Sequence, residues 1–276
     1  MRLSELGELG LLTELERRGL AEHIENDAAQ LGDGLVVTQD SLVEGVHFRL
    51  DWLSWRELGY RAAAVNISDL AASGAQPEAL LVSLGLPRET EAEDVLDLYA
   101  GIADAGVPVR GGDTTDAAAI FVTVTALGRA ERVPGRSGAR PGDRLVVTGP
   151  LGAAGAAFRE ERYTHPPMRV GEGAQLARDA HAMIDLSDGL AVDAGHIAER
   201  SGCRLVIDLE RVPLAPRATH DDLAFGEDFE LLAATANPGR FAVIGRCEAG
   251  SGVQIRHDGD PVALSGWEHF RLRKSR

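Results

Sequence analysis

The residues best suited to chemistry in this chain of 276 residues are six aspartates, most of them close to glycine, serine or threonine. Several directly follow an expected strand, and the six are Asp27, Asp40, Asp69, Asp113, Asp185 and Asp188. Carboxylates that converge on one edge of a sheet repel one another unless cations neutralise them. Oxygen ligands without a cluster of His or Cys favour Mg²⁺ over zinc, and Mg²⁺ held by carboxylates commonly binds substrate phosphates. The pattern therefore indicates Mg²⁺-dependent chemistry on a nucleotide.

Each aspartate also has a structural interpretation, because Asp often caps a helix or occupies a turn. Asn66 and Asp69, three residues apart on an expected helix, would share one of its faces. The glycines Gly149, Gly152 and Gly155 would either cradle a phosphate or form an ordinary turn after a strand. Taken singly, His47 fits a substrate contact and a surface loop equally well. Four other residues have an ordinary role by default: Tyr99 in the core, Arg136 in solvent, Glu227 in an exposed turn and Trp267 in packing. Spacing alone leaves these alternatives open.

Composition excludes several classes of protein. With 43 acidic and 28 basic residues the net charge is −15, which repels nucleic acid. The only lysine is Lys274, so the phosphate-loop and protein-kinase signatures, which need an internal lysine, are absent. No apolar run approaches the ~20 residues of a membrane span and the N-terminus lacks a signal-peptide core, so we expect a cytoplasmic protein without a membrane partner. Cys203 and Cys247 lie in no metal-binding spacing and are expected to be reduced thiols.

Alternating strand and helix patterns predict a layered α/β fold. In the first half we expect strands at 35–38, 80–86, 107–110 and 119–126, with helices at 55–70 and 90–105. Gly74 would stop the first helix, and Thr90, with Glu93 three residues later, would cap the second. The turn-rich segment 133–143 predicts a domain boundary, giving domains 1–136 and 137–276. In the second domain we expect strands at 144–148, 182–185, 204–208, 230–234 and 241–245, and a helix at 190–201.

Six segments are far more specific as an ordered set than singly. They are Thr38–Phe48, Ala64–Ala75, Gly111–Thr115, Arg136–Asp143, Ile184–Leu190 and Gly226–Leu231. In this order they closely resemble the thiamine-monophosphate kinase family, part of the superfamily that includes aminoimidazole ribonucleotide synthetase. The resemblance extends from about Leu9 to Phe270, which is nearly the whole chain.

The resemblance implies a two-domain fold like that of aminoimidazole ribonucleotide synthetase. The N-terminal domain would pair its sheet across a homodimer, and the C-terminal domain would close over the active site. The implied reaction is the ATP-dependent phosphorylation of thiamine monophosphate to thiamine diphosphate, with release of ADP and with several Mg²⁺ ions per site. Direct in-line phosphoryl transfer needs positioning and charge neutralisation more than a covalent catalyst, which is compatible with the lack of an internal lysine.

The motifs of the family also imply roles for individual residues of this chain. The implied metal ligands are Asp27, Thr38, Asp40, Asp69, Asp113, Asp185 and Asp188, of which Asp40, Asp113 and Asp188 would take part directly in the transfer. The implied nucleotide contacts are Tyr99, Gly112, Asp113, Arg136 and Ser187. The implied contacts to thiamine monophosphate are His47, Glu227 and Trp267, and an aromatic wall with acidic groups suits the cationic thiazolium ring.

This sequence departs from the family's pattern in three places. Asn26 stands where the family often has an aspartate, and Gln39 replaces a small hydroxyl residue beside Asp40. The segments 149–165 and 213–225 are also short for the family. Two alternatives remain beside the kinase: a related synthetase that forms an acyl- or amidate-phosphate, and a catalytically silent paralogue that binds Mg²⁺-nucleotide. The segment Gly226–Leu231 and Trp267 favour the kinase over the synthetase, whereas Asn26 and Gln39 keep the silent paralogue open.

Overall fold

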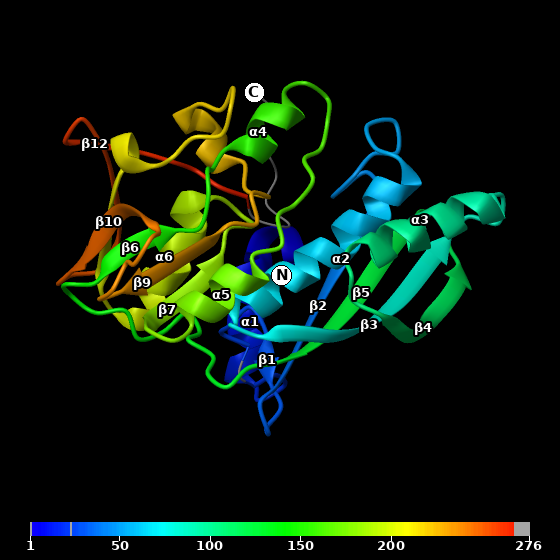
Figure 1. Ribbon diagram of the computed structural model, residues 1–276, viewed down its shortest axis with the longest axis horizontal. Coiled ribbons are helices and arrows are strands. Elements are labelled where there is room, and N and C mark those ends of the chain that lie inside the picture. The colour runs from blue at the N-terminus through cyan, green and yellow to red at the C-terminus, as the bar shows by residue number, and fades with distance from the viewer. Residues whose placement is uncertain (1, 23, 268–276) are drawn as a thin grey trace.

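The chain forms two units that lie side by side along the longest axis of the molecule, each with its own sheet and hydrophobic core (Figure 1). The structure is a computed structural model that describes residues 2–22 and 24–267. Phe270 and Lys274, named above, lie outside these ranges. None of the helices within the described ranges is both long and apolar enough to cross a membrane.

The first unit is built on a five-stranded sheet with the strand order β1-β2-β5-β3-β4. Its strands are β1 (Ala29–Gln30), β2 (Leu35–Val43), β3 (Gln76–Leu86), β4 (Val109–Asp116) and β5 (Phe121–Arg129). Neighbouring strands are antiparallel except β3 and β4, which are parallel. Along β5, buried residues alternate with half-buried ones, because successive side chains point to opposite faces and only one face lies in the core.

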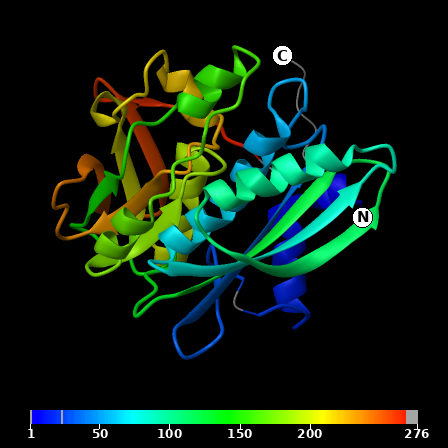
Figure 2. The ribbon, with the colours of Figure 1, turned by 45° about the vertical axis from the view of Figure 1, so that its right-hand side comes forward.

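Two helices lie on one face of this sheet (Figure 2). α2 (Trp55–Ala72) packs on β2 and β5, and α3 (Ala92–Asp104) packs on α2. A capping box of Ser54 and Glu57 starts α2, and the helix ends before Gly74, whose φ of +68° is the left-handed conformation that favours glycine. The two helices meet at Gly59, where a Cβ would lie 1.9 Å from the carbonyl oxygen of Leu98. Glycine at this position therefore sets how closely α3 approaches α2.

The expected cap of α3 is wrong. The N–H of Thr90 donates to the carbonyl oxygen of Pro87 at 3.1 Å, so Thr90 belongs to a turn and does not start the helix. The helix begins after Glu91, whose side chain makes no capping hydrogen bond. Acidic residues in the first turn, Glu93 and Asp94, instead interact favourably with the helix dipole.

The end expected for the strand at 107–110 is also wrong. β4 runs on to Asp116, so Gly112 and Asp113 lie inside the strand instead of after it. Gly112 has a φ of +150°, and a Cβ on it would lie 1.7 Å from the carbonyl oxygen of Val82 on β3. Glycine therefore allows the strand to continue past a point where any side chain would collide with its neighbour.

The second unit is built on a seven-stranded sheet with the strand order β12-β11-β8-β10-β6-β9-β7. Its strands are β6 (Arg144–Val147), β7 (Ala180–Asp185), β8 (Arg204–Asp208), β9 (Leu231–Thr235), β10 (Ala242–Glu248), β11 (Gly252–His257) and β12 (Asp260–Val262). α6 (Leu190–Ser201) covers one face, and α5 (Val170–Leu176) covers the other together with the end of α2. α2 therefore contributes to the cores of both units.

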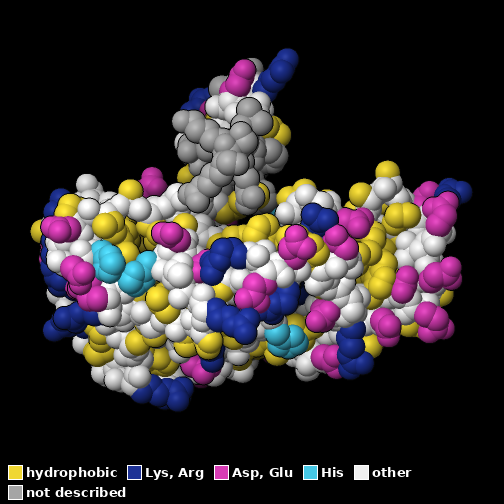
Figure 3. All heavy atoms as spheres, turned by 90° about the horizontal axis from the view of Figure 1, so that it is seen from above, with side chains coloured by type: hydrophobic (Ala, Val, Ile, Leu, Met, Phe, Trp, Pro, Cys, Tyr) yellow, Lys and Arg dark blue, Asp and Glu magenta, His cyan; other side chains and the backbone are white. Residues whose placement is uncertain are grey.

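Shorter and peripheral elements complete the chain. They are α1 (Leu3–Arg17), α4 (Ala153–Phe158) and two 3₁₀ turns at Leu209–Arg211 and His220–Ala224. Residues 130–143 connect the two sheets, and the boundary expected near residue 136 falls in this segment and stays a prediction. Figure 3 shows many acidic side chains at the end of the molecule that the first unit forms, in keeping with the net charge of −15.

Candidate active site

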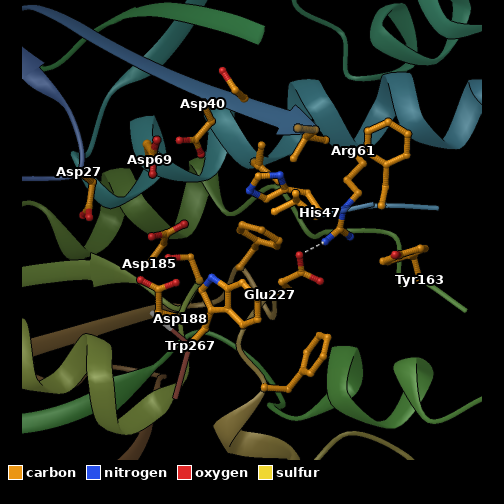
Figure 4. Close-up of a pocket in the computed structure, with 18 of the residues that line it drawn as sticks. Asp27, Asp40, His47, Arg61, Asp69, Tyr163, Asp185, Asp188, Glu227 and Trp267 are labelled. Carbon is orange, nitrogen blue, oxygen red and sulfur yellow. Dashed lines mark ion pairs between the residues drawn. The ribbon is translucent and has the colours of Figure 1, made fainter. Parts of the chain in front are cut away.

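A cavity of about 700 Å³ is lined by residues of both units. Aspartates occupy one end, and Arg61 and Tyr163 lie at the other (Figure 4). The first unit contributes β2 and α2 to the walls, and the second contributes the loops after β7 and before β9. A cavity of this size and composition can enclose a small organic ligand together with polar groups that orient it.

Three aspartates from separate parts of the chain converge at one end of the cavity. Asp27 precedes β1, Asp69 lies on α2 and Asp185 ends β7. Each offers a carboxylate oxygen, and these oxygens all lie within 4.8 Å of one another. Asp40 on β2 and Asp188 in the loop after β7 line the same end (Figure 4). The fold therefore brings together aspartates that are far apart in the sequence.

Contacts between β2 and α2 position the residues from the first unit. Thr38 and Asp40 are two residues apart on β2, so both face α2. The hydroxyl of Thr38 donates to Oδ2 of Asp69 at 2.6 Å. Oδ1 of Asn66 accepts from the backbone N–H of Asp40 at 2.9 Å, and the buried Asn66 amide donates to the carbonyl oxygen of Ala62. Asn66 and Asp69 thus join the same face of the helix to the strand.

Contacts between the units position the remaining acids. The hydroxyl of Ser68 on α2 donates to Oδ2 of Asp185 at 2.6 Å. Arg136, in the segment that connects the two sheets, places Nη2 at 2.5 Å from Oδ1 of Asp27. Arg136 therefore neutralises part of the negative charge at this end and presents its guanidinium to the cavity.

Crowding changes the acidity of the cluster. Burial, with the charges of Asp40, Asp185 and Asp27, raises the pKa of Asp69 well above its ordinary value. Burial and the charge of Asp27 raise the pKa of Asp185 to about 8. Burial also raises the pKa of Asp27, although Arg136 opposes the shift. A bound divalent cation would remove this repulsion and favour the ionised carboxylates.

The opposite end of the cavity is aromatic and carries an ion pair. Trp52 packs edge-on against Phe158 with ring centroids 5.2 Å apart, and Phe158 lies 4.7 Å from Phe225. Nη2 of Arg61 lies 2.8 Å from Oε1 of Glu227. Aromatic faces beside a carboxylate suit a flat or cationic organic ring.

His47 and Trp267 lie between the two ends (Figure 4). Nδ1 of His47 accepts from the backbone N–H of Val43 at 3.0 Å, so the neutral ring carries its hydrogen on Nε2. The backbone N–H of Trp267 donates to the carbonyl oxygen of Asp188 at 2.8 Å. This bond ties the chain at Trp267 to the loop that also supplies aspartates.

Most of the site residues predicted from the sequence line this one cavity. They are Asp27, Thr38, Asp40, His47, Asp69, Arg136, Asp185, Ser187, Asp188, Glu227 and Trp267. Three predicted residues are not among its lining: Tyr99 on α3, and Gly112 and Asp113 on β4. Tyr99 packs half-buried against the core of the first unit.

Asp113 does not reach the cluster of its own chain. Across the sheet, Asp113 is paired with Ser83, Ser83 with Thr123, and Thr123 with Ser41. Paired residues point to the same face of a sheet, and Ser41 points to the face opposite its neighbour Asp40. Asp113 therefore lies three strands from Asp40 and on the opposite face, because β4 continues past the point where the sequence suggested a strand end.

The glycine-rich turn after β6 is filled by a side chain of the same protein. The N–H groups of Gly152 and Ala154 donate to the carboxylate of Asp228 at 2.6 and 3.2 Å. Burial raises the pKa of Asp228 to about 6, although these hydrogen bonds favour its ionised form. Because these two amides already bind an acid, the structure favours the turn interpretation over a phosphate loop here.

Sequence reasoning missed several residues of the cavity. Arg61 and Asp69 are eight residues apart on α2, which places both on one helical face and about 12 Å apart along the axis. The helical spacing from Asp69 could therefore have identified Arg61 as a residue of the same cavity. Trp52 and Tyr163 lie in irregular segments without a motif, so only the folded chain brings them to the same wall.

The amino-acid sequence is similar to those of known proteins over most of its length. Residues 25–130 match the AIR synthase related protein, N-terminal domain, and residues 140–255 match the AIR synthase related protein, C-terminal domain. A thiamine-monophosphate kinase of Aquifex aeolicus is 34% identical and covers 98% of this chain and 100% of its own. Another, from Mycobacterium tuberculosis, is 37% identical and covers 97% of this chain and 93% of its own. This chain belongs to the thiamine-monophosphate kinase family.

A solved structure of the kinase family has the same fold. It is AaThiL complexed with AMPPCP and TMP, which superimposes with a TM-score of 0.88 at 32% identity and covers 98% of this chain and 99% of its own. The resemblance and the two-domain α/β fold predicted from the sequence are therefore confirmed.

The two substitutions that depart from the kinase family's pattern have local structural roles. Oδ1 of Asn26 accepts from the backbone N–H of Arg136 at 2.9 Å, so Asn26 helps to hold that arginine. Oε1 of Gln39 accepts from the hydroxyl of Thr125 on β5 at 2.8 Å. Gln39 thus bonds on the face of β2 that points away from Asp40, and both departures leave the cluster of carboxylates intact.

Proposed function

We propose that this member of the thiamine-monophosphate kinase family transfers the γ-phosphoryl group of ATP to thiamine monophosphate, giving thiamine diphosphate and ADP. The names of its relatives support the proposal, as does AaThiL complexed with an ATP analogue and TMP. The observation that carries it is the cavity, because acids converge at one end while aromatic rings and Glu227 line the other. Phosphates with cations suit the first end, and a flat organic ring suits the second. The cytoplasm, which supplies ATP, stays the predicted location.

The donor set at the first end fits Mg²⁺. Asp27, Asp69 and Asp185 place hard oxygen atoms close together, and burial raises the pKa values of all three, although Arg136 opposes the shift at Asp27. These three residues would hold the ions, with Asp40 and Asp188 beside them. Bound Mg²⁺ supplies neutralisation and orientation of phosphate oxygens.

The residues of the chain would mainly position the two substrates. An oxygen of the acceptor phosphate attacks the γ-phosphorus, the bond to the bridging oxygen breaks, and ADP leaves with that oxygen. The acceptor phosphate is already anionic near neutral pH, so no side chain has to remove a proton. Arg136 and Ser187 would contact the nucleotide at the carboxylate end, while His47, Glu227 and Trp267 would contact thiamine monophosphate.

A direct assay tests the proposal. Purified protein is incubated with ATP, Mg²⁺ and thiamine monophosphate, and thiamine diphosphate and ADP are separated by chromatography. We expect the two products in equal amounts, and neither when unphosphorylated thiamine replaces the acceptor. Binding of Mg²⁺-ATP without any product would instead support a silent paralogue or another substrate of the same superfamily.

We also propose that the functional form is a homodimer in which β4 brings Asp113 to the partner's site. The sheet face opposite α2 presents Leu35, Val37, Leu81 and Leu127, and Leu81 is 39% exposed. Apolar side chains on a sheet face commonly pack against another layer. β4 is an edge strand, so a second chain can come close to it. A shared site would give Gly112 and Asp113 the nucleotide and metal contacts predicted for them. The role of Tyr99 at the nucleotide stays a prediction.

A further inference from the structure

Arg61 is a buried cation whose hydrogen-bond donors are unused. It lies on α2, is 2% exposed and forms part of the cavity wall at the end away from the aspartates (Figure 4). Among the residues that the structure describes, none accepts a hydrogen bond from its Nε, Nη1 or Nη2. Burying a guanidinium that makes no aligned hydrogen bond is unfavourable, so its presence in a ligand cavity calls for a functional explanation.

The groups that surround Arg61 come from the second unit. Nη2 lies 2.8 Å from Oε1 of Glu227, which is an ion-pair distance, although the two groups are not aligned for a hydrogen bond. The guanidinium also lies over the rings of Tyr163 and Phe229, 5.2 and 5.8 Å from their centroids. One acid and two aromatic faces therefore hold a cation that belongs to the first unit.

Glu227 itself lies in a turn with unfavourable backbone angles. Gly226, Glu227 and Phe229 have φ values of 82°, 57° and 51°. Residues other than glycine rarely adopt positive φ, and such angles persist where surrounding contacts enforce them. The N–H of Glu227 donates to the carbonyl oxygen of Ser187 at 2.8 Å, and the N–H of Phe229 donates to that of Leu186 at 2.9 Å. These bonds attach the turn to the loop after β7.

Arg61 is poorly placed to bind a phosphate directly. It lies about 12 Å along α2 from Asp69, which marks the carboxylate end of the cavity. A phosphate among the aspartates would therefore lie toward the opposite end of the cavity. The nitrogen atoms of Arg61 are also covered by protein, with the carboxylate of Glu227 beside them.

We propose that Arg61 is a positioning residue that holds the carboxylate of Glu227 toward the end of the acceptor farthest from its phosphate. This inference rests on the proposed function. In thiamine monophosphate that end is an aminopyrimidine, whose amino group can donate a hydrogen bond to a carboxylate. The positive charge of Arg61 balances the negative charge of Glu227. Recognition of the acceptor therefore depends on the direction of the hydrogen bonds that Glu227 accepts. Because the pair joins the two units, Glu227 takes this position only when the units are docked.

Steady-state kinetics of three variants test the proposal, with thiamine monophosphate and ATP varied separately. We expect Arg61→Met to raise the KM for thiamine monophosphate roughly tenfold or more, with the KM for ATP changed by less than about twofold. Arg61→Lys should recover part of the loss because it restores the charge. Tyr60→Phe is the matched control, because Tyr60 donates to the carbonyl oxygen of Pro166 at 3.0 Å across the same two units.

A double variant tests whether Arg61 acts through Glu227. If it does, Arg61→Met combined with Glu227→Gln should raise the KM for thiamine monophosphate no further than Glu227→Gln alone. Additive effects would overturn the proposal. So would an unchanged KM in Arg61→Met, an equal rise in the KM for ATP, or the same rise in Tyr60→Phe.

Two further outcomes remain decisive. If Arg61→Met does not fold, Arg61→Gln with and without Glu227→Gln gives the same comparison. If the wild-type protein binds thiamine monophosphate but makes no thiamine diphosphate, the proposed function fails. Calorimetric affinity for thiamine monophosphate, weaker in Arg61→Met but not in Tyr60→Phe, then supports the role of Arg61, and equal affinities overturn it.

Discussion

At the scale of single residues, the clustered aspartates make the folded protein sensitive to pH. The pKa of Asp185 is raised to about 8 by burial and by Asp27, and the pKa of Asp69 is also raised by burial and neighbouring acids. The folded chain therefore keeps protons that the unfolded chain has already released. As pH rises from about 4 to about 8, the native state binds more protons than the unfolded state, so the free energy of unfolding falls when no metal is present.

We expect added Mg²⁺ to reverse this loss, and to do so more strongly at pH 8 than at pH 6. The ion binds ionised carboxylates, which are more abundant at the higher pH. At a hundredfold excess over its Kd, Mg²⁺ should raise the Tm by roughly 5–10 °C. Thermal unfolding with EDTA or Mg²⁺ at both pH values measures the effect, and Asp185→Asn should weaken its pH dependence. A Mg²⁺ effect that is the same at pH 6 and pH 8 would contradict the assignment of the cluster as the metal site.

At the scale of elements, two adjacent glycines of β4 have different roles. A Cβ on Gly112 would lie 1.7 Å from the carbonyl oxygen of Val82, whereas a Cβ on Gly111 would meet only Leu81 Cδ2 at 3.5 Å, an ordinary contact. Gly112 also has a φ of +150°, which disfavours any side chain. β4 therefore depends on Gly112 to stay paired with β3.

Gly112→Ala should lower the free energy of unfolding by about 2 kcal/mol or more, while Gly111→Ala should change it by less than about 1 kcal/mol. Urea unfolding of the two variants provides the comparison. The activity of Gly112→Ala should fall as well, because the same strand carries Asp113. Equal losses of stability in both variants would show that the close approach to Val82 does not limit this strand.

At the scale of the whole molecule, a shared site predicts that two inactive chains restore each other. Asp113→Asn removes the carboxylate given to the partner, and Asp185→Asn damages the cluster of the chain's own cavity. Each variant alone should lose most turnover. A dimer that contains one chain of each kind has one intact site of two, so random mixing should restore about a quarter of the wild-type activity.

The measurement is the rate of thiamine diphosphate formation after the two variants are mixed, dissociated and reassembled. Mixing Asp185→Asn with a second cluster variant, Asp69→Asn, is the control, because no pairing of those chains yields an intact site. Failure of the Asp113 and Asp185 variants to restore each other would disprove the shared site. Full activity of Asp113→Asn on its own would remove that residue from the chemistry.

Local patterns predicted much of the fold but not its longer-range contacts. The helix that became α2 was predicted from apolar spacing and Gly74, since both act within a few residues. The length of β4 was missed because the close contact of Gly112 with Val82 joins segments thirty residues apart. Thr90 was misassigned for a similar reason, because its turn with Pro87 competes with a helix cap.

Motifs predicted the aspartates of the candidate site but not the residues at its aromatic end. Aspartates such as Asp27 and Asp185 stood out because their type and neighbours suggest metal chemistry, and the structure places both in the cluster. Arg61 and Trp52 did not stand out, because an arginine on a helix or a tryptophan in a loop has many ordinary roles. Only the folded chain distinguishes them, through their contacts with residues of the second unit.

One unbroken helix, α2, carries both Arg61 and Asp69, so the helix itself sets the spacing between these two residues. Thiamine diphosphate is longer than its precursor by one phosphate. If its ring stays beside Glu227, its new terminal phosphate extends past the aspartates and is misplaced for a second transfer. The fixed distance along the helix therefore limits the number of phosphates that an acceptor can carry and still react. We expect the enzyme to stop at the diphosphate without a separate step that rejects the triphosphate.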